Sequence, residues 1–222
     1  MPAILFGSIS TVADTSELQR KAFNDAFAAH GLHWSWDRDD YRALLTSSGG
    51  RSRVAEYAGS RGENVDAYAV HQTKSALFQE ELAAAELDPR PGVVDAVRSA
   101  KSLGWKIGLV TTTSGANVAA LLEAVGPHLT ADDFDVIVDS SDVEQSKPDQ
   151  EAYVFALQAL GETADRCVAI EDNVEGVQAA VAAGLACVAF PNENTADHDF
   201  ADAERRIDHV DVEDLKNLTA AA

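Results

Sequence analysis

Hydroxyl side chains cluster in the stretch TTTSG, which follows the apolar run KIGLV and precedes a helical pattern. Residues 111–114 would offer hydroxyls and backbone N–H groups at the start of a helix, where the helix dipole and the unpaired donors favour a phosphate. Ser114 alone could also be a simple helix cap, because serine before a helix is common. The position at the end of a predicted strand favours the phosphate site.

A lysine that could face such a phosphate lies in the stretch SKPD. Lys147 precedes Pro148, which restricts the lysine to extended backbone and can aim its ammonium inward from a loop. A KPD stretch on its own also fits a surface turn. A point cation opposite a hydroxyl loop, however, is what phosphate binding in an acidic protein requires.

Two adjacent carboxylates, Glu171 and Asp172, end the apolar run CVAI. At the mouth of a site their charges would repel one another, and a Mg²⁺ ion would offset that repulsion. Asp172 could instead cap the helix that follows. We favour the metal because a cap needs only one acid, whereas hard cations prefer clustered oxygens.

The stretch ILFGSISTVADT has the layout in which many enzymes present a nucleophile, with a strand, a small-residue turn and then a helix. The turn holds Gly7, Ser8, Ile9 and Ser10, none of which is an acid. Strand alternation points Ser8 away from the side that positions 7 and 9 share. We therefore expect no carboxylate at this place.

Helical and strand patterns alternate after Pro91, in the order VDAVRSAKSLG, WKIGLVTTT, GANVAALLEAVG, FDVIVDSS, DQEAYVFALQALG, RCVAIED, NVEGVQAAVAAGL and ACVAFP, with a last helix near DVEDLKNL. This alternation predicts an α/β fold with a doubly wound parallel sheet, to which the first strand AILF also belongs. The polar stretches then share the carboxyl edge of one sheet, which is where ligands bind in such folds.

Residues 16–87 interrupt this pattern as a block of helices inserted after the first strand. The stretches SELQRKAFNDAFAAHG, DRDDYRALLTSS and VDAYAVHQTKSALFQEELAAAE read as three helices, and LDPRPGVV as the linker that follows. We expect Trp34 and Trp36 to pack these helices against one another.

Composition limits the function. The chain of 222 residues has 37 acidic and 17 basic side chains, a net charge of −20, which disfavours nucleic-acid and anionic-membrane surfaces. Cys167 and Cys187 lie in apolar runs and are expected to be small buried hydrophobic residues. The six histidines show no ligand spacing. Neither a signal peptide nor a membrane span is indicated, so we expect a cytoplasmic protein.

The stretches ADT, TTT, KPDQEAYVFAL and IEDNVEGVQAAVAAGL strongly resemble the motifs of the haloacid dehalogenase-like phosphatases, which are an aspartate pair, a hydroxyl, a lysine and an acidic pair. The resemblance covers the entire chain. FNDAFAAHGLHWSWDRDDYRALL and GGRSR are similar to the CbbY-like branch of sugar-phosphate phosphatases, related to β-phosphoglucomutase, whose members act on xylulose bisphosphate. The family resemblance implies a Rossmann-like core of residues 1–15 and 88–222 and a helical cap domain of residues 16–87.

The resemblance also implies roles for individual residues. Arg51 or Arg53 of the cap loop SSGGRSR would contact a distal phosphate of the substrate. The implied residues are Thr111, Thr112 and Lys147 for phosphate, Arg51, Arg53 and Asn117 for substrate, and Asp172 and Glu171 for Mg²⁺.

The first motif departs from the family. Gly7 and Ile9 stand where the family has the aspartate that attacks phosphorus and the aspartate that transfers protons. Loss of a nucleophile lowers the rate by a factor on the order of 10⁴ to 10⁶. Mg²⁺ binding should be weakened as well, because Gly7 supplies no carboxylate.

These observations favour an inactive or very weak pseudo-phosphatase that binds a phosphorylated sugar or a protein partner. The alternative is an active Mg²⁺-dependent phosphatase of sugar phosphates or bisphosphates in which metal-activated water replaces the aspartate. A third hypothesis is an ordinary phosphatase with an altered first motif, in which aspartates would restore turnover.

Overall fold

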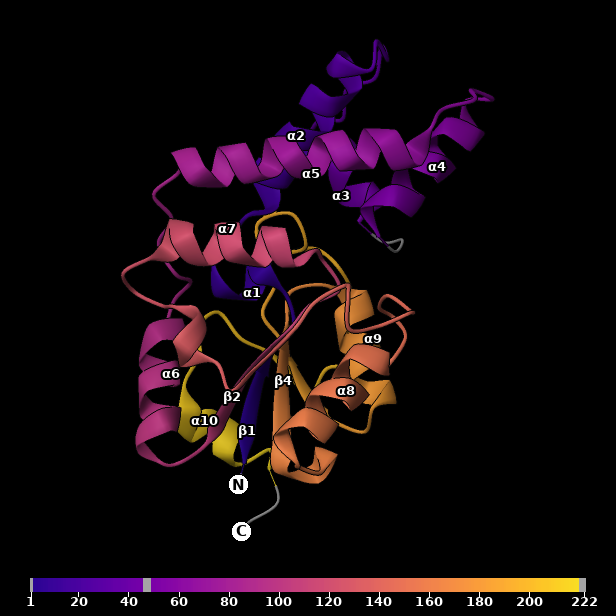
Figure 1. Ribbon diagram of the computed structural model, residues 1–222. Coiled ribbons are helices and arrows are strands. Elements are labelled where there is room, and N and C mark those ends of the chain that lie inside the picture. The colour runs from indigo at the N-terminus through magenta and orange to yellow at the C-terminus, as the bar shows by residue number, and fades with distance from the viewer. Residues whose placement is uncertain (1, 46–48, 220–222) are drawn as a thin grey trace.

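A computed structural model describes residues 2–45 and 49–219 of the chain (Figure 1). The strands are β1 Ala3–Phe6, β2 Lys106–Val110, β3 Val136–Val138, β4 Cys167–Glu171, β5 Ala186–Ala189 and β6 Arg205–Arg206. The α-helices are α1 Ile9–Val12, α2 Ser16–Ala29, α3 Arg38–Leu44, α4 Gly50–Ser60, α5 Ala67–Ala84, α6 Val93–Ser102, α7 Gly115–Val125, α8 Glu151–Leu160, α9 Val174–Ala182 and α10 Val212–Lys216.

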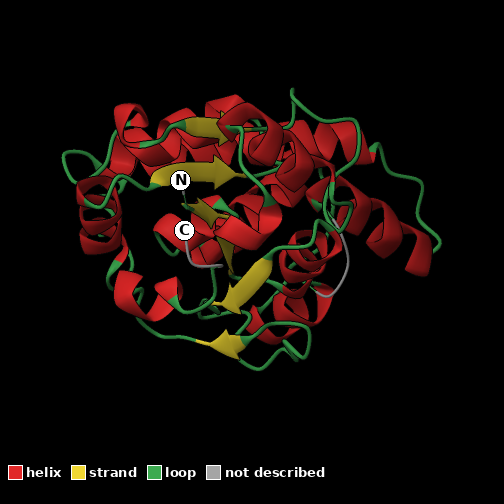
Figure 2. Ribbon diagram, turned by 90° about the horizontal axis from the view of Figure 1, so that it is seen from below, coloured by secondary structure: helices red, strands yellow, loops and turns green. Residues whose placement is uncertain are grey.

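The strands form one parallel sheet in the order β3-β2-β1-β4-β5-β6, which confirms the predicted α/β fold. Figure 2 shows the strands between layers of helices. β1 lies at the centre, with β2 on one side and β4 on the other. The strand order therefore changes direction at β1, and a crevice for ligands opens at the carboxyl ends of these three strands.

Alternate residues of β1 point to the two faces of the sheet, as strand geometry requires. Ile4 and Phe6 join the core cluster that includes residues of α6, α7 and α10, whereas Ala3 and Leu5 join the cluster that includes residues of α8 and α9. Figure 1 shows α8 and α9 on one side of the sheet and α6 and α10 on the other. Cys167 and Cys187 are both free and buried, as expected.

Helices α2 to α5, which we call the insertion helices, lie over the carboxyl ends of the strands (Figure 1). Their own core is aromatic, and Trp34 and Trp36 pack within it against the surrounding helices, as expected for these two residues. The Trp36 ring lies 4.6 Å from that of Phe27 and 5.0 Å from that of Phe23. Trp36 is fully buried and Trp34 nearly so.

Three elements were not predicted, namely α1, β6 and α4, of which α4 bears on the site. Part of the stretch SSGGRSR was predicted as a loop, but α4 begins at Gly50 and carries both arginines. Residues 47 and 48 of that stretch lie outside the described residues. No helix within the described ranges combines the length and apolar character that crossing a membrane requires.

Candidate functional site

The turn after β1 places Ser8 at the site. Ser8 is the N-cap of α1, and its side chain accepts a hydrogen bond from the backbone N–H of Thr11. Its hydroxyl donates to Asp172 Oδ1 at 2.7 Å. The expectation that Ser8 points away was wrong, because β1 ends at Phe6 and strand alternation no longer applies beyond it.

The space beside Gly7 is filled by a carboxylate from the neighbouring strand. A Cβ atom built on Gly7 would lie 2.1 Å from Glu171 Oε1 and 2.3 Å from the Tyr153 hydroxyl. On the other side of the same carboxylate, a Cβ on Gly176 would lie 2.1 Å from Glu171 Cδ. Two residues without side chains therefore leave room for Glu171, contrary to the expectation that no carboxylate lies there.

Lys147 holds the Glu171 carboxylate in place. Its Nζ lies 2.6 Å from Glu171 Oε1 and donates to the carbonyl oxygens of Val110, at 2.7 Å, and Gly7. The Tyr153 hydroxyl donates to the same Glu171 oxygen at 2.7 Å. Burial raises the pKa of Glu171 and Lys147 opposes that rise. Lys147 does point inward as predicted, but its charge is matched within the protein.

Glu171 is therefore a poor nucleophile and a poor metal ligand in this arrangement. It is fully buried, and it is not among the residues that line the pocket described below. Its Oε1 accepts two hydrogen bonds, and its Oε2 is enclosed without a hydrogen-bond partner.

Asp172 has partners of its own on both oxygens. Oδ1 accepts from the Ser8 hydroxyl and from the Asn173 amide at 3.0 Å, and Oδ2 accepts from the Asn192 amide at 2.6 Å. Asn173, not Asp172, caps α9. The described residues contain no group of three or more His, Cys, Asp or Glu side chains that could hold a metal ion. As they stand, the residues proposed for Mg²⁺ do not fit that ion.

The hydroxyl loop lies at the N-terminus of α7, as predicted. Ser114 caps this helix by accepting from the backbone N–H of Asn117, so capping does occur. The Asn117 amide donates to the Thr113 hydroxyl at 2.8 Å and accepts from Gln79 of α5 at 2.9 Å. Thr111, Thr112 and Asn117 all line the pocket.

Basic side chains reach the pocket from the insertion helices. Arg51 and Arg53 line it from α4, and Arg53 is 7% exposed. Two further residues, His71 and Lys74 of α5, also line it. The sequence analysis missed both, because an amphipathic helix gives no sign of which polar residues face a cavity.

Lys74 is the most unusual of these. It is 4% exposed and lies over the rings of Phe23 and Phe78, and its Nζ donates to the neutral Gln19 amide at 3.1 Å. Burial, with some contribution from Arg53, lowers the pKa of Lys74 to about 7. Burial likewise lowers the pKa of His71 to about 4 and raises that of Glu175, on the core side, to about 7.

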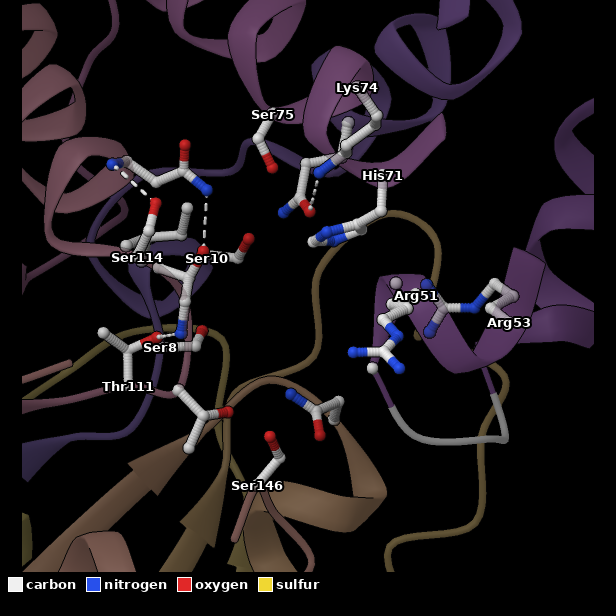
Figure 3. A pocket seen from close by; sticks show the side chains of 18 of the residues that line it. Ser8, Ser10, Arg51, Arg53, His71, Lys74, Ser75, Thr111, Ser114 and Ser146 are labelled. Atoms are coloured by element: carbon white, nitrogen blue, oxygen red, sulfur yellow. Dashed lines mark hydrogen bonds between the residues drawn. The ribbon is translucent and has the colours of Figure 1, made fainter. Parts of the chain in front are cut away.

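These residues enclose a pocket of about 880 Å³ between the insertion helices and the carboxyl ends of the strands. Figure 3 shows Arg51, Arg53, His71 and Lys74 on one side and Ser8, Thr111 and Ser146 on the other. Most of the remaining lining residues carry a hydroxyl or an amide. A pocket of this size and chemistry suits a polyol that carries an anionic group.

Known proteins resemble this chain in sequence and in fold. A family model described as haloacid dehalogenase-like hydrolase matches residues 1–184. The chain is 40% identical to the protein CbbY of Cereibacter sphaeroides, over 93% of this chain and 91% of that protein. It is similar to a crystal structure of a CbbY mutant from Rhodobacter sphaeroides in complex with xylulose 1,5-bisphosphate, with a TM-score of 0.86 and 39% identity over 94% and 95% of the two chains. The fold also matches a β-phosphoglucomutase from Clostridium difficile, with a TM-score of 0.77 and 20% identity over 98% and 96% of the chains.

Proposed function

This chain belongs to the haloacid dehalogenase-like hydrolase family, and we propose that it binds a phosphorylated sugar in its pocket without hydrolysing it. One observation carries the proposal. The place that a side chain at position 7 would take holds the Glu171 carboxylate, which is buried and paired with Lys147.

The residues at positions 7 and 9 cannot perform the two steps that the family assigns to its first motif. Gly7 cannot attack phosphorus, and Ile9 cannot transfer a proton. Ser8 is the nearest hydroxyl, but it donates to Asp172, which already accepts amide hydrogen bonds on both oxygens. A serine nucleophile needs a base that is free to take its proton, and both oxygens of Asp172 are already occupied by amide donors.

Binding of a phosphorylated sugar is supported by the pocket lining. Arg51, Arg53 and Lys74 offer positive charge, and hydroxyls and amides offer hydrogen bonds to a polyol. The similar CbbY structure holds xylulose 1,5-bisphosphate, which is a sugar of this kind. Metal-activated water, the alternative route to catalysis, would need carboxylates free to hold the ion, and no observation favours it.

The proposal is tested by incubating the protein with xylulose 1,5-bisphosphate and Mg²⁺ while phosphate release and ligand-dependent thermal stability are measured in parallel. We expect stabilisation without release, with a gain of about 2.7 kcal/mol at a ligand concentration one hundred times the dissociation constant. Turnover within about a hundredfold of that of an active CbbY, or about 2.7 kcal/mol in barrier, would refute inactivity. A phosphorylated protein adduct in mass spectra would refute it too.

A further inference from the structure

We propose that the pocket takes a sugar or polyol with a single anionic group, that this group lies against insertion helices α4 and α5, and that no divalent cation takes part. This inference rests on the proposed function, since it specifies the ligand of the same pocket. It departs from the bisphosphate seen in the similar structure.

Positive charge in the pocket lies on the insertion side. Arg51, Arg53 and Lys74 come from α4 and α5, and Figure 3 shows them facing the cavity from the same side. Among the described residues, the Lys74 ammonium has no carboxylate within ion-pair distance, and its one hydrogen-bond partner is the neutral Gln19 amide. A buried cation without a counter-charge is costly, so an anion that enters here supplies the charge the site lacks.

The core side carries no surplus of positive charge. Within the described part of the chain, Lys147 is the one lysine or arginine that lines the pocket from the core, and Glu171 matches its charge at 2.6 Å. Asp172 then adds a carboxylate, and Glu175 adds a second titratable acid. A phosphate at this end would face like charge in a partly enclosed site, where Coulomb interactions are stronger than in water.

Hydrogen-bond donors take the place of a cation at Asp172. Ser8, Asn173 and Asn192 present three neutral donors to its two oxygens. Thr195 also donates to the Asp172 backbone carbonyl at 2.6 Å. A Mg²⁺ ion would have to displace these donors while the second carboxylate of the pair, Glu171, stays bound to Lys147. The carboxylate is therefore stabilised without metal.

The neutral groups at the core end suit the other part of such a ligand. Ser8, Thr111, Thr112 and Ser146 line this end and can bond sugar hydroxyls, which act as both donors and acceptors. The ligand then lies with its charged group toward α4 and α5 and its neutral hydroxyls toward the strand ends.

The test is a calorimetric comparison of xylulose 5-phosphate with xylulose 1,5-bisphosphate, each in Mg²⁺ and in EDTA. We expect the monophosphate to bind more tightly, by about tenfold, with the same affinity in both buffers. Lys74→Met should weaken its binding, whereas Lys101→Met, which alters an exposed lysine of α6 paired with Asp133, should leave the affinity unchanged.

Three results overturn this inference and leave the proposed function standing. The bisphosphate binds at least as tightly as the monophosphate, or Mg²⁺ tightens the binding of either sugar. The third is that Lys74→Met leaves the binding unchanged, because the anion then lies elsewhere. If neither sugar binds in either buffer, the inference and the binding half of the proposed function fail together.

Discussion

Glu171 Oε1 lies 2.1 Å from the position that a Cβ atom on Gly7 would occupy. No side chain fits at position 7 unless the Glu171 carboxylate moves away from Lys147 and Tyr153. The absence of a side chain at position 7 and the placement of the Glu171 carboxylate therefore depend on each other.

Gly7→Ala should destabilise the fold by about 1–3 kcal/mol, because the added methyl overpacks a filled site. Chemical denaturation measures the loss. Gly59→Ala is a matched control, since a Cβ there meets nothing within 4 Å. That helical substitution should leave stability unchanged or raise it by about 0.5 kcal/mol. If Gly7→Ala also leaves the free energy of unfolding unchanged, Glu171 moves freely. If Gly7→Ala destabilises a Glu171→Ala variant less than it destabilises the natural chain, the two positions are coupled.

Glu171→Gln should lower the free energy of unfolding by about 3 kcal/mol, because it leaves the buried Lys147 ammonium without its carboxylate. The comparison is Asp25→Asn, which breaks the exposed Lys21 to Asp25 pair at 3.0 Å and should have a much smaller effect. Losses of equal size in urea titrations would argue against a special role for the buried pair.

The double variant Gly7→Asp with Ile9→Asp should be less stable than the natural chain in EDTA and regain stability in Mg²⁺. It adds two carboxylates beside Glu171 and Asp172 and removes Ile9 from the core cluster. A metal ion would offset the new repulsion. Thermal melts in both buffers measure the difference, with single Ile9→Asp as the control for lost packing. Stabilisation of the natural chain by Mg²⁺ would contradict the metal-free site.

Without ligand, Lys74→Met should have a higher free energy of unfolding than the natural chain, and the difference should be largest at pH 7 and below. The pKa of Lys74 falls from 10.5 to about 7 on folding, so the unfolded chain holds more protons between those values and stability rises with pH across them. The advantage of the variant should therefore shrink as the pH rises from about 7 to about 10.5.

Denaturation of both proteins across this pH range tests the prediction, and the difference between them isolates Lys74. Arg51 and Arg53 of α4, His71 of α5 and Glu175 of α9 also line this pocket, but they are common to both proteins. Anion binding should raise the pKa of Lys74 again, so the natural chain should take up protons at pH 8 when the monophosphate binds, and Lys74→Met should take up fewer. If the stability difference between the two proteins does not change with pH, burial does not lower the pKa of Lys74 and the prediction is wrong.

The periodicity of the sequence predicted most of the fold because buried strands and amphipathic helices leave regular patterns. It missed α4, since Gly49, Gly50 and the following Arg-Ser-Arg run have little apolar periodicity and favoured a loop. The tips of β2 and β4 were identified correctly, because a parallel sheet brings its carboxyl ends together. The contacts of the tip residues could not be predicted from the sequence. The placement of the Glu171 carboxylate beside Gly7 depends on packing between strands that are distant in the chain.

The enclosure of Glu171 between Gly7 and Gly176 also bears on which substitutions the chain can tolerate. An aspartate at position 7 would meet a steric and electrostatic penalty as long as Glu171 keeps its present place. Positions 7, 171 and 176 therefore form one mutational unit, in which a larger side chain at either glycine is tolerated only together with a change at Glu171.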